Sequence, residues 1–117
     1  EMKLTPRFYQ DGERIFGPGV AELMQQVQVH RSLRSAAQAM EMAYSKAWRI
    51  IRNAEEGFGC KLLNSTIGGR NGGGAVLTLE AERLLAAYEA YCADVGTYAQ
   101  GKFEDAFRFY RDLDHRP

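Results

Sequence analysis

Residues 32–52 carry two short helical patterns separated by only three residues, and this spacing limits the folds open to the chain. The first pattern is rich in small side chains (Ala36, Ala37 and Ala39), so another helix can approach it closely. The segment from Glu41 to Ala43 interrupts the pattern, and a second helix follows from about Tyr44. Two helices joined by so short a turn are typical of a helix-turn-helix motif.

The second helix, about Tyr44 to Phe58, has one apolar and one basic side. At about 100° per residue, one side carries Ser45, Arg49, Arg52 and Glu56, with Lys46 on its shoulder. The opposite side carries Ala47, Ile50, Ile51, Ala54 and Phe58. Arginine is the commonest base-reading residue in the DNA major groove, and lysine and serine suit phosphates or base edges. An ordinary amphipathic helix with a solvated face has the same pattern, so this helix alone does not decide between the two.

The single tryptophan of the chain, Trp48, lies at the border between these two sides, near 300° from Ser45 at about 100° per residue. A lone tryptophan at helical spacing usually packs in the interior. We therefore predict that Trp48 is a core residue and not a DNA contact.

The net charge of zero is unevenly distributed along the chain. Residues 31–70 contain seven basic and three acidic residues, whereas residues 71–117 contain five basic and eight acidic ones. The basic segment coincides with the predicted helix-turn-helix, which favours a polyanionic partner for that region.

Several classes of protein find no support in the composition. No run approaches the about 18 apolar residues of a membrane span, and we expect neither a signal peptide nor a membrane partner. Cys60 and Cys92 match no metal or redox spacing, so we expect free thiols in a reducing cytoplasm. His30 and His115 have no cluster around them, which makes zinc or another cofactor unexpected. Because no catalytic constellation stands out, we do not expect an enzyme.

A β-hairpin is predicted within Leu4–Phe16, because Asp11-Gly12 is a strong two-residue turn between two short strand patterns. An isolated hairpin would be only marginally stable, so it must pack on the helices or extend another sheet. Val20, Leu23, Met24 and Val27 then predict a helix with a core-facing stripe, ending near His30. Ser32 is a plausible N-cap for the next helix, from Leu33 to Met40.

Two further strand patterns, Lys61–Ile67 and Ala75–Thr78, flank the glycine-rich run Gly68-Gly69-Arg70-Asn71-Gly72-Gly73-Gly74. A nucleotide-binding loop is disfavoured, because the Lys and Ser/Thr of a P-loop and the helix of a dinucleotide fingerprint are missing after the glycines. A strand, glycine loop and strand after a helix-turn-helix are typical of a wing, whose tip lies on the DNA backbone or in the minor groove, where Arg70 would be attracted. A merely flexible hairpin tip is the alternative.

From Leu79 to about Leu113 the chain is largely helical, with Thr78 as its cap. Apolar and aromatic residues recur along it at steps of three to five: Leu84, Tyr88, Tyr91, Val95, Tyr98, Phe103, Phe107 and Tyr110. A domain of this size cannot bury so long a stripe, which predicts pairing with a second copy. Two shorter helices folding back, with breaks at Gly96 or Gly101, are the alternative.

The order of these elements resembles the N-terminal DNA-binding domain of the ModE-type, molybdate-responsive transcriptional regulators, a winged-helix group related to the LysR-type regulators. The matching residues are Ser35-Ala36-Ala37, Tyr44-Ser45-Lys46-Ala47-Trp48 and above all Gly68 to Thr78, within about residues 3–91. The resemblance implies that five residues contact the major groove or phosphates: Tyr44, Ser45, Lys46, Arg49 and Arg52. It also implies that Arg70 contacts DNA from the wing. Nothing resembles the molybdate-binding domain of full-length members, so a molybdate link rests on the resemblance alone.

Two residues in the turn depart from the family pattern, which usually has Gly where this chain has Glu41 and Ser where it has Ala43. Glu41 brings a Cβ atom and a negative charge into the turn, and would be strained if the turn is left-handed there. Ala43 lacks an N-cap oxygen, which is worth about 1 kcal/mol.

We therefore predict a mainly α protein with little β structure. Residues 1–78 would form a winged helix-turn-helix domain with an N-terminal hairpin, and residues 79–117 a C-terminal helical dimerisation segment. The predicted function is sequence-specific binding of double-stranded DNA by a homodimeric transcriptional regulator. Arg34, Lys46 and the wing would contact phosphates, while Arg49 and Arg52 would read bases. The alternative is a winged-helix module whose basic face meets an acidic protein.

Overall fold

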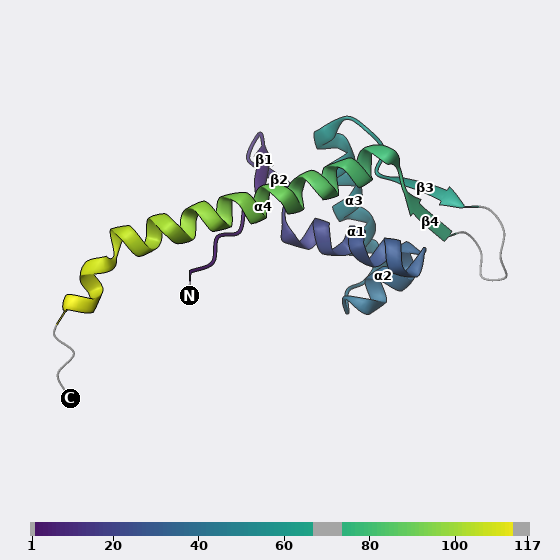
Figure 1. The fold of residues 1–117 in the computed structure, drawn as a ribbon. Coiled ribbons are helices and arrows are strands. Elements are labelled where there is room, and N and C mark those ends of the chain that lie inside the picture. The colour runs from purple at the N-terminus through teal and green to yellow at the C-terminus, as the bar shows by residue number, and fades with distance from the viewer. Residues whose placement is uncertain (1, 67–73, 114–117) are drawn as a thin grey trace.

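The computed structural model describes residues 2–66 and 74–113, which form helices with two small antiparallel hairpins. One end of the molecule is a rounded body, and a long helix extends from it to the C-terminal end (Figure 1). The elements, in chain order, are β1 (Phe8–Gln10), β2 (Glu13–Phe16), α1 (Pro18–His30), α2 (Leu33–Ala39), α3 (Tyr44–Phe58), β3 (Leu63–Thr66), β4 (Gly74–Leu77), α4 (Leu79–Ala106) and the 3-10 helix η1 (Arg108–Asp112). This order confirms the predicted winged helix-turn-helix fold.

The first hairpin closes through Asp11 and Gly12, whose φ angles are 51° and 83°. Positive φ at both central residues defines the type of turn that matches the natural twist of two strands, so the predicted turn is confirmed. Strand β2 ends in Phe16, which is fully buried. The hairpin therefore packs on the helices, as its marginal stability required.

Aromatic rings fix this hairpin to the body. The ring of Phe16 lies 5.0 Å from that of Tyr88 on α4 and 5.7 Å from that of Phe58 on α3, and Phe8 lies 5.8 Å from Tyr88. The Tyr88 hydroxyl donates a hydrogen bond to the backbone oxygen of Pro6 at 2.8 Å. Burial, followed by the neighbouring Cys92 side chain, raises the pKa of Tyr88 to about 12.

The core of the body lies between α1, α2 and α3. Helix α1 buries Val20, Leu23, Met24 and Val27, the predicted stripe. Helix α2 contributes Leu33, Ala36 and Ala37, and α3 contributes Ala47, Ile51 and Ala54. Because alanine has a single methyl group, the buried alanines of α2 and α3 allow these helices to approach their neighbours closely.

Local caps fix where these helices begin and end. Ser32 Oγ accepts a hydrogen bond from the Ser35 amide at 3.1 Å, and Thr78 Oγ1 accepts one from the Ala81 amide at 3.1 Å, so both predicted caps are confirmed. The turn between α2 and α3 places Glu41 at φ 55°, in the left-handed region. Ala43 precedes α3 in an extended conformation and provides no side-chain cap.

The second hairpin pairs β3 with β4 in the register Leu63 with Leu77 to Thr66 with Gly74. Gly74 is required there, because a Cβ atom would lie 2.6 Å from Thr66 Oγ1 and 2.7 Å from the Arg31 backbone oxygen. The predicted wing tip, including Arg70, lies outside the described residues, and only its base at Gly74 is described.

Helix α4 continues through Gly96 and Gly101 to Ala106, so the alternative of two shorter helices folding back on the chain is wrong. Only its first turns are buried, through Ala81, Leu85 and Tyr88. Gln25 of α1 donates a hydrogen bond to Glu89 at 2.7 Å, and the ring of Tyr91 lies 6.1 Å from that of Phe8. After these contacts and the partly buried Cys92, α4 leaves the body (Figure 1).

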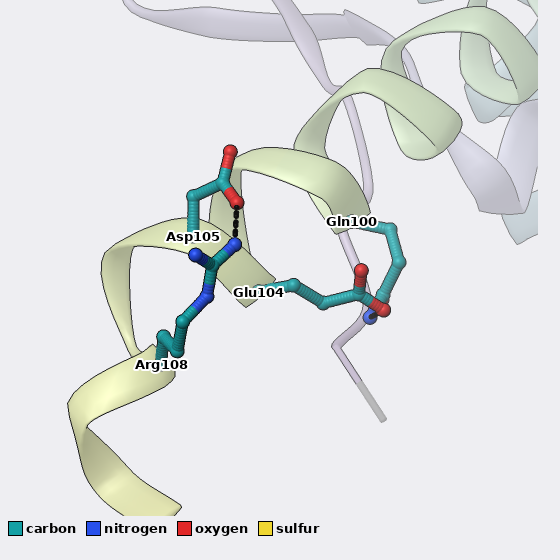
Figure 2. Close-up of polar contacts among 4 residues, drawn as sticks. All are labelled: Gln100, Glu104, Asp105 and Arg108. Atoms are coloured by element: carbon teal, nitrogen blue, oxygen red, sulfur yellow. Dashed lines mark hydrogen bonds and ion pairs between the residues drawn. The ribbon is translucent and has the colours of Figure 1, made fainter.

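Polar contacts accompany the change from α4 to η1 (Figure 2). Gln100 Nε2 donates to Glu104 Oε1 at 3.3 Å, and Arg108 forms an ion pair with Asp105 at 2.6 Å. The predicted helix to about Leu113 therefore ends in a short 3-10 segment. None of the described helices is both long and apolar enough to cross a membrane.

Candidate nucleic-acid interface

Helix α3 presents one polar side to solvent. Ala47, Ile51 and Ala54 are buried, and Ile50 and Phe58 are partly buried against the core. The residues predicted for the opposite side are all exposed: Ser45, Arg49, Arg52 and Glu56, with Lys46 on the shoulder. Tyr44, the first residue of α3, is exposed as well. The predicted division of this helix into a buried and an exposed side is therefore confirmed.

Trp48 is not a core residue, and this prediction was wrong. Its side chain is 46% exposed, and the Arg52 guanidinium lies over its ring with 4.7 Å between the guanidinium carbon and the ring centre. The helical position of Trp48 is at the border of the buried stripe, and Ala47 and Ile51 already complete that stripe. The indole therefore lies along the outer surface of α3, where Arg52 one turn away covers its face.

A second pair of this kind bridges the turn of the helix-turn-helix. The guanidinium carbon of Arg34, on α2, lies 4.3 Å from the ring centre of Tyr44, the first residue of α3. Both side chains are exposed. Each arginine thus has an aromatic face beneath it, within the about 6 Å over which a cation and a ring attract.

The two pairs line the same hollow, which has a volume of about 480 Å³ and lies between α2, α3 and the base of the second hairpin. Lys61 and Ser65 also line it. Among the described residues predicted to contact DNA, Arg34, Tyr44 and Arg52 meet in this hollow, whereas Ser45, Lys46 and Arg49 do not line it. The predicted site therefore divides into this hollow and an exposed ridge, which is formed by Ser45, Lys46 and Arg49.

One carboxylate, Glu55, also lines the hollow. Its Oε2 accepts a hydrogen bond at 2.9 Å from the backbone amide of Leu62, which joins α3 to the base of the hairpin. Glu55 therefore has a structural partner, and the positive charge of Arg34, Arg52 and Lys61 exceeds its negative charge.

Sequence reasoning missed Trp48, Glu55 and Lys61 as members of this surface. Trp48 and Arg52 are four residues apart, a spacing at which side chains meet on a helix, so their contact had a local signal. The only sequence signal for Lys61 was its position close to the first strand of the second hairpin. Among the described residues, no group of three or more His, Cys, Asp or Glu side chains is placed to hold a metal ion.

These elements define a winged helix-turn-helix protein with a basic outer surface. The sequence model of the bacterial regulatory helix-turn-helix proteins of the lysR family matches residues 21–82, just over half of the chain. The chain belongs to this LysR-type family, and its N-terminal region is a helix-turn-helix domain of the ModE type. The members of this family are described as bacterial regulatory helix-turn-helix proteins.

Similar proteins include the transcriptional regulator ModE of Haemophilus influenzae, 32% identical over 88 residues that cover 75% of this chain and 32% of the relative. The DNA-binding transcriptional dual regulator ModE of Escherichia coli K12 is 28% identical over 88 residues, covering 75% and 31%. The molybdenum-pterin-binding protein MopB of Rhodobacter capsulatus is 36% identical over 64 residues, covering 55% and 24%. The chain thus spans between a quarter and a third of the length of these relatives.

Proposed function

We propose that this chain binds double-stranded DNA at specific sequences, with α3 in the major groove and the second hairpin beside it. The observation that carries the proposal is the exposed ridge of Ser45, Lys46 and Arg49 on a helix whose other side is buried. A helix presents such a ridge to base edges, and arginine distinguishes guanine through two hydrogen bonds. Arg49 is accordingly the proposed base-reading residue, and Lys46 a phosphate contact.

The proposal includes a homodimer formed through α4. Leu84, Tyr88, Tyr91, Val95 and Tyr98 follow one another at alternating steps of four and three, the spacing of paired helices. Tyr88 is buried within its own chain, but Tyr91 and Tyr98 are 50% and 62% exposed. A second copy of the helix would cover this apolar stripe, and two copies of α3 would then face successive major grooves, about 34 Å apart.

The test is fluorescence anisotropy of the purified chain with a labelled random-sequence duplex across a salt series. We expect binding in the micromolar range, about 10⁻⁴–10⁻⁶ M near physiological salt, that weakens steeply as salt rises. Selection from a random library should then yield a palindromic site. A chain that binds no duplex even at low salt would refute the proposal and leave the basic surface to an acidic protein partner.

A further inference from the structure

We propose that the hollow between α2, α3 and the base of the second hairpin binds a backbone phosphate of the DNA, with Arg34 and Arg52 as ligands. Trp48 and Tyr44 are then positioning residues that hold the two arginines. This inference rests on the proposed function, and it changes the predicted role of Arg52 from reading bases to holding the backbone.

The geometry of the two pairs leaves the arginines free to bind an anion. Each guanidinium lies over an aromatic face, Arg34 on Tyr44 at 4.3 Å and Arg52 on Trp48 at 4.7 Å. A guanidinium held over a ring face spends no N–H donor on a hydrogen bond to a charged group there, so its donors remain for an anion. A stacked arginine also has less side-chain freedom to lose when it binds.

The charges around the hollow lack a sufficient counter-charge within the described part of the chain. Arg34, Arg52 and Lys61 line it together with one carboxylate, Glu55, which already accepts the Leu62 amide at 2.9 Å. The ion pair found among residues 2–66 and 74–113 joins Arg108 to Asp105 and involves none of these cations. Three positive groups around one hollow favour an oxyanion between them.

The position of the hollow indicates the DNA backbone rather than the bases. Base edges are reached by a ridge that enters the groove, and Ser45, Lys46 and Arg49 form that ridge without lining the hollow. The hollow lies to one side of the ridge, toward α2 and the hairpin, where the phosphates at the rim of the groove would pass. Contacts to phosphates position a protein on DNA without carrying sequence information.

The test compares Arg52→Ala with Arg49→Ala on two duplexes, one with the selected site and one of random sequence, across a salt series. Arg52→Ala should weaken binding to both by the same factor and lower the salt slope by about one. Arg49→Ala should weaken the selected site by roughly tenfold or more and the random duplex much less. Arg83→Ala, which removes an exposed charge that does not line the hollow, is the matched control.

The positioning role has its own variants. Trp48→Leu removes the aromatic face and should weaken binding to both duplexes roughly two- to fivefold, whereas Trp48→Phe should retain most of the affinity. Circular dichroism melting of each variant confirms that it is folded. An equal loss in the leucine and phenylalanine variants would show that the ring face is not what holds Arg52.

Trp48 is also the single tryptophan of the chain, so its fluorescence reports on the hollow directly. Binding of the random duplex should reduce the quenching of this fluorescence by iodide, because the backbone would cover the Arg52–Trp48 pair. Unchanged quenching on a duplex that binds would overturn the inference, as would a loss confined to the selected site in Arg52→Ala. Absence of any duplex binding by the unaltered chain would instead refute the proposed function.

Discussion

The Arg52 guanidinium carbon lies 4.7 Å above the ring centre of Trp48, one turn away along α3, and both side chains are on the outer surface. The contact explains how a large aromatic residue can stand at the border of an amphipathic helix without entering the core. It also moves Arg52 away from the Ser45–Arg49 ridge.

Replacing Trp48 by alanine should have a small effect on folding. Because the side chain is 46% exposed, the free energy of unfolding should fall by about 1 kcal/mol or less. A buried tryptophan would cost about 3–5 kcal/mol. Urea unfolding followed by circular dichroism measures the difference, with Ile51→Ala, at a position only 4% exposed, as the buried comparison. A loss in Trp48→Ala as large as that in Ile51→Ala would contradict the surface placement.

Replacing Glu41 by glycine should stabilise the domain. Glu41 has φ 55°, which costs about 1 kcal/mol or more for a residue with a Cβ atom, while glycine loses more chain entropy on folding. We expect a net gain of about 0.5 kcal/mol in the free energy of unfolding. Glu41→Gln, which keeps the Cβ atom and removes the charge, should show little of this gain. If the glutamine variant gained as much as the glycine variant, charge and not backbone strain would be responsible.

Two glycines in helices should respond to alanine in opposite ways. At Gly57 of α3 a Cβ atom would lie 2.5 Å from Ile15 Cγ2, so Gly57→Ala should destabilise by about 1–3 kcal/mol. At Gly96 of α4 a Cβ atom would meet nothing within 4 Å, so Gly96→Ala should stabilise by about 0.5–1 kcal/mol. Thermal unfolding of the pair under identical conditions tests the contrast, and shifts of the same sign would refute it.

Tyr88 should make the stability of the protein sensitive to alkaline pH. Its pKa is raised from 10.0 to about 12 by burial and by Cys92, so the folded state favours the neutral hydroxyl. The contribution of the neutral Tyr88 hydroxyl to the free energy of unfolding is therefore fully present below pH 10. This contribution is lost as the pH rises through about 12. Tyr88→Phe should lose about 1 kcal/mol at neutral pH with the bond to Pro6, and should lack this part of the alkaline loss. Unfolding measured from pH 8 to 12 in both proteins checks the sign, and parallel curves would contradict it.

Tyr98→Glu should disrupt the proposed dimer without unfolding the domain. Tyr98 is 62% exposed on the stripe of α4 beyond the body, where a partner helix would bury it. An unpaired charge in that interface should weaken dimerisation by roughly tenfold or more. Thr97→Glu introduces the same charge at the neighbouring exposed position, about 100° around the helix. The dimer of this variant should dissociate far less than that of Tyr98→Glu. Sedimentation velocity over a concentration series measures this, and a chain monomeric at every concentration would refute the dimer.

Much of the fold could be predicted from the sequence because its signals are local. The Asp11-Gly12 turn, the Ser32 and Thr78 caps and the buried stripe of α1 each depend on residues within a few positions of one another. The exposed side of α3 followed from the same helical period. For Glu41 the sequence raised only the condition of a left-handed turn, and the structure shows that the condition holds, with φ 55°.

Tertiary structure alone decided how these elements meet. Arg34 reaches Tyr44 only because the turn brings α2 across the start of α3, and the hollow exists only because the base of the second hairpin closes its third side. The side of Trp48 was decided by Ala47 and Ile51, which complete the core beside it. Short-range sequence patterns fix backbone conformation within a few residues. Which side chains become neighbours depends on the space left between packed elements, and that space is set by the whole domain at once.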